Sequence, residues 1–339
     1  MPSPPAIPEV FPPHAPSPGK LLVLATGGTI AGLAADPARP DVYQAAQLAV
    51  EALVSSAPTL AELHRAGRLE LTQLSQIDSK DMSFAVWRDL ALAARSAMRR
   101  DDVDAVLVTH GTDTLEETAY FLRCTVPAIK PVVITGAMRA ANAPGADGPA
   151  NLRDAAAFAL HGRLPGVWVV MGAEVFAAGD VRKLRSQAQG AFAGLQSGLP
   201  LGAGGLAESD ASRLRDIDAA APGPSAQDLA LDKLDPASWP WVEIVTSAAG
   251  ADGRVVDALV RAGVSGLVVA GTGSGTVHDA LQPALERAHH AGVHILVASR
   301  LGLGEARDTR GSWPRAGGLS PAQARVRLTL ELLVLQPRG

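Results

Sequence analysis

Residues 21–32 read LLVLATGGTIAG, and this stretch decides the fold, because an apolar run breaks there into two glycines between two threonines. Four consecutive aliphatic residues predict a strand covered on both faces, as the strands of parallel sheets are. Gly27 and Gly28 lack the Cβ atom that would keep a ligand away from the backbone, and they permit a sharp turn. Thr29 then presents a hydroxyl at the carboxyl end of a strand, which is the edge where open parallel sheets bind ligands.

The same design recurs at residues 105–114, which read AVLVTHGTDT and place Asp113 beside Thr112. For the first stretch taken alone, a tight turn without chemistry is an open alternative. A phosphate or dinucleotide loop is a weaker interpretation, because the first stretch has neither the G-x-G-x-x-G spacing nor a Gly-Lys-Ser/Thr ending. The second hydroxyl-rich glycine turn favours a site built from both turns.

The length of 339 residues exceeds the usual size of a single core, so we expect two domains. Hydrophobic residues make up 47% of the chain and charged residues 19%, which is enough apolar surface for globular cores. The formal net charge is −4 and the positive residues are scattered, so no nucleic-acid partner is indicated. No apolar run approaches the roughly 20 residues that a membrane helix needs.

The N-terminus is rich in proline and has neither a basic start nor a long apolar segment, so residues 1–19 are predicted to form a disordered leader. The single cysteine, Cys124, rules out an internal disulfide and fits a reducing compartment, which predicts a cytoplasmic protein. Because Cys124 ends an apolar helical pattern, we interpret it as a buried structural thiol.

Strands, loops and helices alternate along the chain, which predicts an α/β fold with a mostly parallel sheet flanked by helices. We expect a larger N-terminal catalytic domain over 20–205, an irregular interdomain linker over 206–239 and a smaller C-terminal α/β domain over 240–339. In the first domain we expect a lid at 32–42, a polar loop at 179–185, strands at 69–74, 131–135 and 167–171, and helices at 44–54, 83–100, 115–123 and 151–160. In the second we expect strands at 241–246, 266–270 and 294–298, helices at 255–262 and 277–291, and a last helix opened by Ser320-Pro321.

Four polar residues follow predicted strands of the same sheet, so we expect them to converge on one cleft: Thr29, Ser79, Thr112 and Asp113. A threonine hydroxyl is a poor nucleophile at neutral pH and needs a base or a group whose pKa is displaced toward neutrality. Tyr43 and Lys183 are the two candidates for that role, because Tyr120 lies in an apolar helical stretch and lysine, unlike arginine, can lose its proton.

Structural interpretations of the same residues stay open from spacing alone. Asp113 is also suited to cap the following helix, and a lysine in a charged loop, such as Lys183, is usually solvated. His110 does not indicate a Ser/His/Asp hydrolase, since no G-x-S-x-G segment exists, and a histidine in a turn is more often structural. The remaining histidines have no metal-ligand spacing, so we predict no metal and no cofactor.

Residues 26–32 (TGGTIAG) and 110–119 (HGTDTLEETA) resemble the two signature segments of bacterial-type L-asparaginases, of the asparaginase/glutaminase family. Further similarity lies at residues 77–87, 136–139, 146–149, 180–183 and 271–275, so the resemblance spans the chain from about residue 20 onward. It implies an amidohydrolase that converts L-asparagine to L-aspartate and ammonia, with secondary activity on L-glutamine.

The resemblance also implies roles for single residues. Thr29 matches the nucleophile that forms an acyl-enzyme, and Tyr43 matches the tyrosine that contacts its hydroxyl. Thr112, Asp113 and Lys183 match a second catalytic cluster, in which the lysine activates a hydroxyl or water. The positions matching substrate-binding residues are Gly28, Ser79, Lys80, Thr112, Asp113, Ser274 and Glu305.

Three positions depart from the family pattern. Lys80 stands where the family usually has Gln, Glu or Ser, and Ser274 stands where many members have an Asn supplied by a neighbouring subunit. The segment 301–310 is shorter than its counterpart in periplasmic members, so Glu305 is matched to the neighbour's carboxylate by position only. The family implies a homotetramer of close dimers. An amidase acting on another ω-amide and a non-catalytic amino-acid-binding protein are the competing hypotheses.

Overall fold

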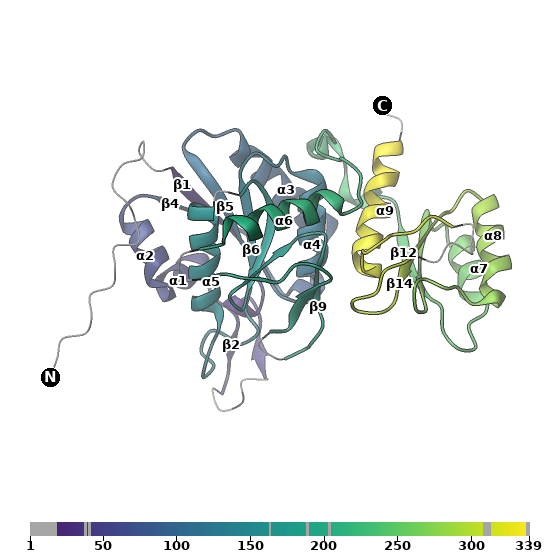
Figure 1. Ribbon diagram of the computed structural model, residues 1–339, viewed down its shortest axis with the longest axis horizontal. Coiled ribbons are helices and arrows are strands. Elements are labelled where there is room, and N and C mark those ends of the chain that lie inside the picture. Colours follow the sequence, from purple (N-terminus) through teal and green to yellow (C-terminus); the bar gives the residue numbers. More distant parts are fainter. Residues whose placement is uncertain are drawn as a thin grey trace.

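Two sheets lie side by side in the computed structural model, with helix α9 (Pro321–Leu335) between them (Figure 1). The structure describes residues 19–36, 39, 42–162, 164–187, 190–202, 205–307 and 313–336. Apart from Gly19, the predicted leader lies outside these residues. The α/β architecture with a large N-terminal sheet and a smaller C-terminal one is as predicted.

The larger sheet has seven strands in the order β11-β8-β7-β6-β5-β1-β4. The five strands from β7 to β4 are parallel, whereas β8 and β11 run antiparallel at one edge. Parallel strands end at the same edge of a sheet, so the turns after β1, β4 and β5 are neighbours. The strands are β1 (Lys20–Gly27), β4 (Leu69–Ile77), β5 (Val103–Thr109), β6 (Pro131–Thr135), β7 (Gly166–Met171), β8 (Glu174–Ala177) and β11 (Leu199–Pro200).

Both faces of this sheet are covered by helices, because successive side chains of its strands point to opposite sides. In β1, Leu22 and Leu24 pack with α3 and α4, whereas Leu21 and Val23 pack with α1, α2 and α5. The helices are α1 (Val50–Ser56), α2 (Pro58–Arg65), α3 (Phe84–Met98), α4 (Leu115–Thr125) and α5 (Gly148–Ala157), which continues as the π-helical η3 (Phe158–Gly162).

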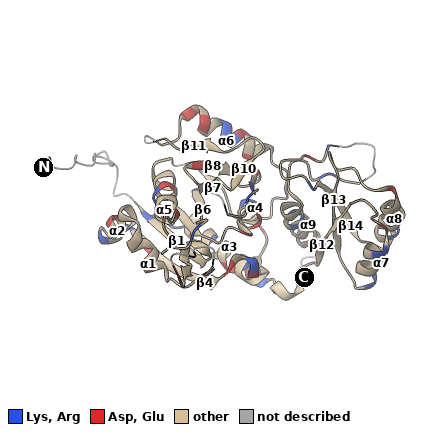
Figure 2. Ribbon diagram, turned by 90° about the horizontal axis from the view of Figure 1, so that it is seen from below, with Lys and Arg blue, Asp and Glu red and all other residues tan. Residues whose placement is uncertain are grey.

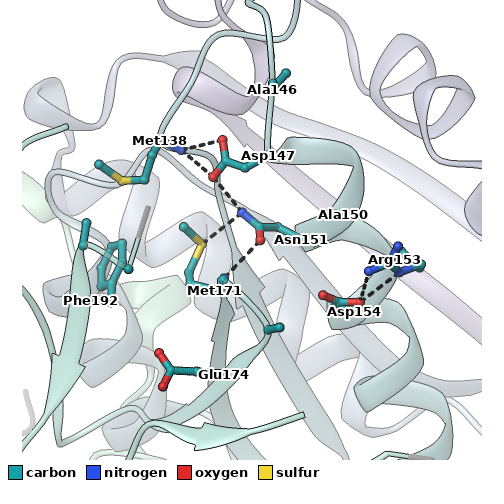
Figure 3. Close-up of a pocket in the computed structure, with 15 residues that line it drawn as sticks. Met138, Ala146, Asp147, Ala150, Asn151, Arg153, Asp154, Met171, Glu174 and Phe192 are labelled. Atoms are coloured by element: carbon teal, nitrogen blue, oxygen red, sulfur yellow. Dashed lines mark hydrogen bonds and ion pairs between the residues drawn. The ribbon is translucent and has the colours of Figure 1, made fainter. Parts of the chain in front are cut away.

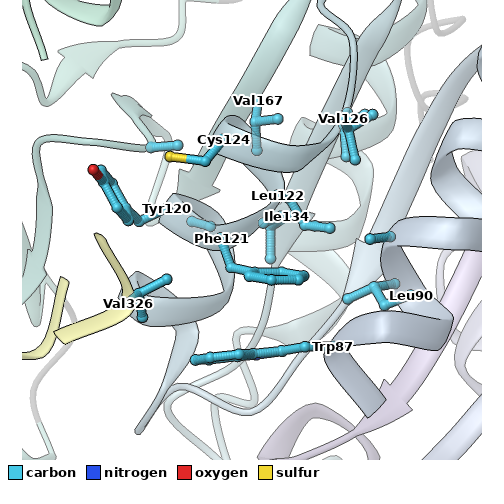
Figure 4. Packing of buried hydrophobic residues seen from close by; sticks show 14 of the residues in the cluster. Trp87, Leu90, Tyr120, Phe121, Leu122, Cys124, Val126, Ile134, Val167 and Val326 are labelled. Atoms are coloured by element: carbon cyan, nitrogen blue, oxygen red, sulfur yellow. The ribbon is translucent and has the colours of Figure 1, made fainter. Parts of the chain in front are cut away.

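Aromatic rings from α3 and α4 occupy the core on one face of the sheet (Figure 4). The rings of Trp87 and Phe121 stack with their centroids 5.0 Å apart, and Leu90 and Ile134 belong to the same cluster. Cys124 is buried in the same cluster, as predicted, and so is the ring of Tyr120. This packing anchors the start of α4, which follows directly after the second threonine turn.

The smaller sheet consists of β12 (Val242–Thr246), β13 (Gly266–Gly271) and β14 (His294–Ser299), all parallel. One face packs against α7 (Arg254–Arg261) and α8 (Gln282–His290), which follows the short η6 (Asp279–Leu281). The other face packs against α9, whose Val326 and Leu330 belong to the same apolar cluster as Tyr120 of α4. Helix α9 therefore joins the two sheets through one continuous core.

Several expected elements differ from the structure. The helix predicted over 44–54 begins only at Val50, because Ala46 has a φ of 57° and its N–H bonds to the Gly28 carbonyl at 3.0 Å. The segment 32–42, predicted as a lid, contains β2 (Leu33–Ala34), which pairs with β3 (Tyr43–Gln44) directly after that segment; residues 37–38 and 40–41 lie outside the described residues. The helix predicted over 277–291 likewise starts later, as η6 and α8.

Two polar segments form regular structure that the sequence analysis did not expect. The loop predicted at 179–185 contains strand β9 (Val181–Lys183), which pairs with β10 (Phe192–Gly194). The connection at 206–239 contains α6 (Glu208–Ala220), η4 (Leu231–Lys233) and η5 (Pro236–Ser238), so the prediction that it is irregular was wrong. Leu214 and Ile217 of α6 pack into the core beside β8, which explains why a largely polar segment is helical.

Acidic and basic residues are interspersed along the helices around both sheets (Figure 2). Within the part of the chain that the structure describes, no helix is long and apolar enough to cross a membrane.

Candidate active site

The first threonine turn begins where β1 ends. Gly28 has φ 82° and ψ −171°, a conformation that is essentially open only to glycine, and the chain then enters η1 (Thr29–Ala31). The Thr29 Oγ1 atom lies 2.8 Å from the Tyr43 hydroxyl, in a hydrogen bond in which either oxygen is able to donate. Thr29 is 7% exposed and Tyr43 is 38% exposed, so the pair sits at the edge of the solvent.

The second threonine turn, after β5, carries an ion pair. The Lys183 Nζ atom donates to Thr112 Oγ1 at 2.8 Å and to Asp113 Oδ1 at 2.6 Å. The Lys183 side chain is only 15% exposed, which contradicts the alternative that it is a solvated surface lysine. Asp113 does not cap α4, because its carboxylate is turned toward this lysine and the N-cap position is Thr114.

The two turns are in direct contact through glycines. A Cβ atom built on Gly28 would lie 2.3 Å from the backbone nitrogen and Cα of Gly111, so the chains approach as closely as two residues without side chains allow. Ser79, in η2 (Ser79–Asp81) after β4, lies against them: its Oγ accepts the Asp113 N–H at 3.2 Å. Thr29, Ser79, Thr112 and Asp113 therefore converge, as the strand order predicts.

A buried hydrogen-bond chain supports the second turn from below. His110 Nδ1 lies 2.6 Å from the Gly111 carbonyl, and Nε2 lies 2.9 Å from Thr118 Oγ1, which also accepts the Trp87 indole N–H at 2.8 Å. Burial lowers the pKa of His110 to about 4, with a smaller opposing contribution from the bond to Gly111. A carbonyl only accepts and an indole only donates, so neutral His110 donates through Nδ1 and accepts the Thr118 hydroxyl proton through Nε2.

This chain of hydrogen bonds fixes the orientation of the peptide group between Gly111 and Thr112. In a trans peptide the C=O and the next N–H point in opposite directions, so holding the Gly111 carbonyl toward His110 turns the Thr112 N–H to the other side. The interpretation of His110 as a structural residue agrees with its full burial and its partners.

Three candidate substrate-binding residues make their polar contacts with other groups. Lys80 pairs with Asp81, and its side chain is 62% exposed. Ser274 is exposed in the turn after β13, where its carbonyl accepts the Arg307 N–H at 3.0 Å. Glu305 forms an ion pair with Arg307 and is close to Gly318. Within a single chain, the partners described for Lys80, Ser274 and Glu305 are therefore Asp81 and Arg307.

The loop after β6 closes the site on another side. A Cβ atom on Gly136 would lie 3.2 Å from the Thr112 methyl carbon, and Asp147 fixes the loop by accepting the N–H groups of Met138 and Arg139 at 2.9 and 3.0 Å. Asn151, on α5, donates to Asp147 at 3.1 Å (Figure 3) and to the Gly136 carbonyl at 3.0 Å.

A cavity of about 410 Å³ lies beyond this loop, at the carboxyl ends of β6 and β7 (Figure 3). The residues that line it include Met138, Asp147, Asn151 and Glu174. The lining does not include the two threonines, the tyrosine or the lysine of the turns described above. The convergence of reactive groups therefore marks the candidate site better than the volume of this cavity does. Among the described residues there is no group of three His, Cys, Asp or Glu side chains that could hold a metal ion.

Sequence reasoning missed one polar residue close to the site. Glu116, in the first turn of α4, accepts the Lys183 backbone N–H at 2.9 Å and the Ser320 hydroxyl at 2.9 Å. Acidic residues in the first helical turn are common for electrostatic reasons, so the place of Glu116 within the segment 110–119 did not by itself indicate that its carboxylate contacts strand β9.

Comparison with known proteins agrees with this architecture. Residues 20–204 match the family model described as Asparaginase, N-terminal, and residues 241–334 match the Glutaminase/Asparaginase C-terminal domain. The crystal structure of a probable cytoplasmic L-asparaginase from Campylobacter jejuni superposes with a TM-score of 0.76 at 30% identity, covering 93% of this chain and 95% of that one.

Curated relatives give the same result. The chain is 36% identical to L-asparaginase 2 of Escherichia coli and 36% identical to a probable periplasmic L-asparaginase of Haemophilus influenzae, in each case over 92% of this chain and 88% of the relative. It is 33% identical to a glutaminase-asparaginase of Pseudomonas fluorescens over 90% of this chain and 84% of the relative. The chain therefore belongs to the asparaginase/glutaminase family.

Proposed function

We propose that this protein hydrolyses the side-chain amide of L-asparagine to L-aspartate and ammonia, with L-glutamine as a slower second substrate. Membership of the family and the names of the relatives, L-asparaginase and glutaminase-asparaginase, support this activity. The observation that carries it is the contact between two threonine turns, one hydroxyl facing Tyr43 and the other facing Lys183.

In the proposed reaction, the Thr29 oxygen attacks the side-chain amide carbon. The carbon–nitrogen bond breaks, and the hydroxyl proton passes to the leaving nitrogen. Ammonia departs, and the acyl group remains on Thr29 as an ester. Water then attacks the ester carbon, which releases aspartate and restores the threonine hydroxyl. The hydrogen bond to Tyr43 supports this role for Thr29, because it supplies a path by which the hydroxyl proton leaves.

The second turn supplies activation and anchoring in this scheme. Lys183, held by Asp113 and Thr112, activates the hydroxyl or the attacking water, because an ammonium of a lysine is able to lose its proton. Gly28, Ser79, Thr112 and Asp113 bind the substrate's polar groups, with Ser79 and Asp113 holding the α-carboxylate and the α-ammonium. An anchored substrate places its amide at a fixed nucleophile, which is a large part of the rate enhancement of such enzymes.

We also propose a homotetramer built from close dimers, in which the partner subunit's Ser274 and Glu305 complete the substrate site. The exposure of Ser274 supports this assignment. Light scattering of the purified protein measures the oligomeric state, and a monomer with full activity would contradict the shared site.

A division into domains at 20–205 and 240–339 is supported by the two family matches, and a cytoplasmic location is supported by the single cysteine.

Ammonia release from L-asparagine and L-glutamine tests the proposed function, measured for the wild type, Thr29→Ala and Lys183→Met after each variant is shown to be folded. We expect asparagine turnover to fall by on the order of 10⁴-fold in both variants, as it does when acyl-transfer enzymes lose a nucleophile or its activating group. A wild type that binds aspartate in calorimetry but releases no ammonia from either amide would instead indicate an amino-acid-binding protein.

A further inference from the structure

Glu116, in the first turn of α4, is a partly buried carboxylate with hydrogen bonds to both of its oxygens. Its Oε2 accepts the backbone N–H of Lys183 at 2.9 Å, and its Oε1 accepts the hydroxyl of Ser320 at 2.9 Å. The three residues come from segments far apart in the sequence, namely α4, β9 and the start of α9. Glu116 therefore ties the strand that carries the lysine to both the threonine-turn helix and the C-terminal helix.

The first turn of α9 holds the same strand at further points. Ser320 caps α9 in a capping box with Gln323, and the buried Gln323 side chain donates to the carbonyls of Ala178 and Val181 at 3.3 and 3.2 Å. Arg182, which is buried, donates to the Gly318 carbonyl. Because β9 is only three residues long, the bonds to the Val181 carbonyl, the Arg182 side chain and the Lys183 N–H involve every residue of the strand.

Alternation along β9 separates the arginine and lysine side chains. Successive side chains of a strand point to opposite faces, so Arg182 enters the interface with α9 while Lys183 reaches Thr112 and Asp113. The bond from the Lys183 N–H to Glu116 holds the backbone from which the lysine side chain extends. A shift of the strand there would move the Nζ atom away from both of its partners.

The contacts of Glu116 suit an ionised carboxylate, because both partners donate. Burial raises the pKa of the Glu116 carboxyl, whereas the Lys183 N–H, the Ser320 hydroxyl and the charge of Arg182 act to lower it. The neighbouring Glu117 has a different partner, because it pairs with Arg325 of α9 at 3.2 Å.

We propose that Glu116 is a positioning residue for Lys183, setting the place of its ammonium through the backbone N–H, and that Ser320 couples this position to the C-terminal helix. The inference rests on the proposed function, because it assigns Glu116 an effect on the reaction through Lys183. Errors of about 1 Å in the placement of a catalytic group cost on the order of 10²-fold in rate, so a loosened strand has a measurable effect.

The test compares two conservative variants that separate geometry from charge. Glu116→Gln keeps the length of the side chain and one carbonyl oxygen but removes the charge; Glu116→Asp keeps the charge but is one methylene too short to reach both partners. We expect Glu116→Asp to lower kcat for asparagine by about 10-fold with KM within about twofold, and Glu116→Gln to retain kcat within about threefold. Glu117→Asp, which shortens the adjacent α4–α9 contact, is the matched control and is expected to keep kcat within about twofold.

A double variant shows whether the effect passes through the lysine. Glu116→Asp added to Lys183→Met is expected to lower kcat no further, because the group that Glu116 positions is already absent. The inference is overturned if Glu116→Gln is more impaired than Glu116→Asp, if Glu116→Asp matches Glu117→Asp, or if the double variant is additive. Failure of the proposed function gives a different result, since the wild type itself would then release no ammonia from L-asparagine or L-glutamine.

Discussion

The two threonine turns have similar sequences, but the partners of their threonine hydroxyls differ in burial. Thr29 bonds to Tyr43, a partly exposed residue on the short β2–β3 hairpin, whereas Thr112 bonds to Lys183, which is mostly buried and fixed by Glu116. Beneath Thr112 lies the buried chain that includes His110. In the mechanism proposed above, the two turns therefore have different tasks: the first presents the nucleophile beside a partner near the solvent, and the second holds the activating lysine.

The contact between the turns is the point where a single change has the largest expected effect. A methyl group at Gly28 collides with the Gly111 backbone, and the φ and ψ of Gly28 are unfavourable for any other residue. We expect Gly28→Ala to lower the free energy of unfolding by about 3 kcal/mol and to abolish activity.

Gly67→Ala is the matched control for that variant, because Gly67 has a φ of 69° and a Cβ atom added there would meet nothing within 4 Å. Backbone strain alone predicts a loss of about 1 kcal/mol at Gly67, with full activity. Urea unfolding of both variants measures the difference, and equal losses would mean that contact between the turns contributes nothing.

His110 makes the frame beneath Thr112 sensitive to acid. Its pKa is about 4 in the folded protein and about 6.5 when unfolded, so the unfolded state binds more protons between these values. Stability therefore falls as the pH decreases from about 6.5 to 4, by up to about 3 kcal/mol from this residue. Unfolding free energies of the wild type and His110→Gln across this range isolate the contribution, and parallel curves would contradict it.

Thr118→Val breaks the middle of the same buried chain. The change leaves the Trp87 indole N–H and the His110 Nε2 without their partner, and we expect a loss of about 2 kcal/mol in unfolding free energy. Thr125→Val on the same helix removes only a bond to the Phe121 carbonyl and is expected to cost less than about 1 kcal/mol. Thermal unfolding of the two variants ranks them; a larger loss at Thr125 would show that the chain does not support the turn.

Of the substitutions considered, Lys80→Gln has the smallest expected effect. Its side chain is turned to Asp81 and is largely exposed, so Lys80→Gln is expected to change the asparagine-to-glutamine ratio of kcat/KM by less than about threefold. Kinetics on both amides measure the ratio. A change of tenfold or more would place the Lys80 side chain at the substrate.

The parts of the site that the sequence predicted are those with a strong local signal. Apolar runs ending in glycine and threonine identify β1 and β5, and the parallel order brings Thr29, Ser79 and Thr112 to one edge. Strand β9 was missed because three residues, two of them charged, carry no periodicity; its stability comes from β10 and α9. Helix α6 was missed because only Leu214 and Ile217 mark its buried side.

The role we assign to Glu116 depends on contacts with residues far away in the sequence. Lys183 is more than 60 positions away, and Ser320 is about 200 positions away. Local pattern contains no information about such pairs, because a glutamate in the first turn of a helix is favourable whether or not it meets a partner. Positioning residues of this kind become visible only when distant segments are assembled.

Trapping of the acyl-enzyme tests most directly which of the two threonines is the nucleophile. Asparagine turnover is quenched with acid, and trypsin then separates the peptide containing Thr29 from the peptide containing Thr112 for mass spectrometry. We expect an added aspartyl group on the Thr29 peptide in the wild type and none in Thr29→Ala. An aspartyl ester on the Thr112 peptide, or one that persists in Thr29→Ala, would contradict it.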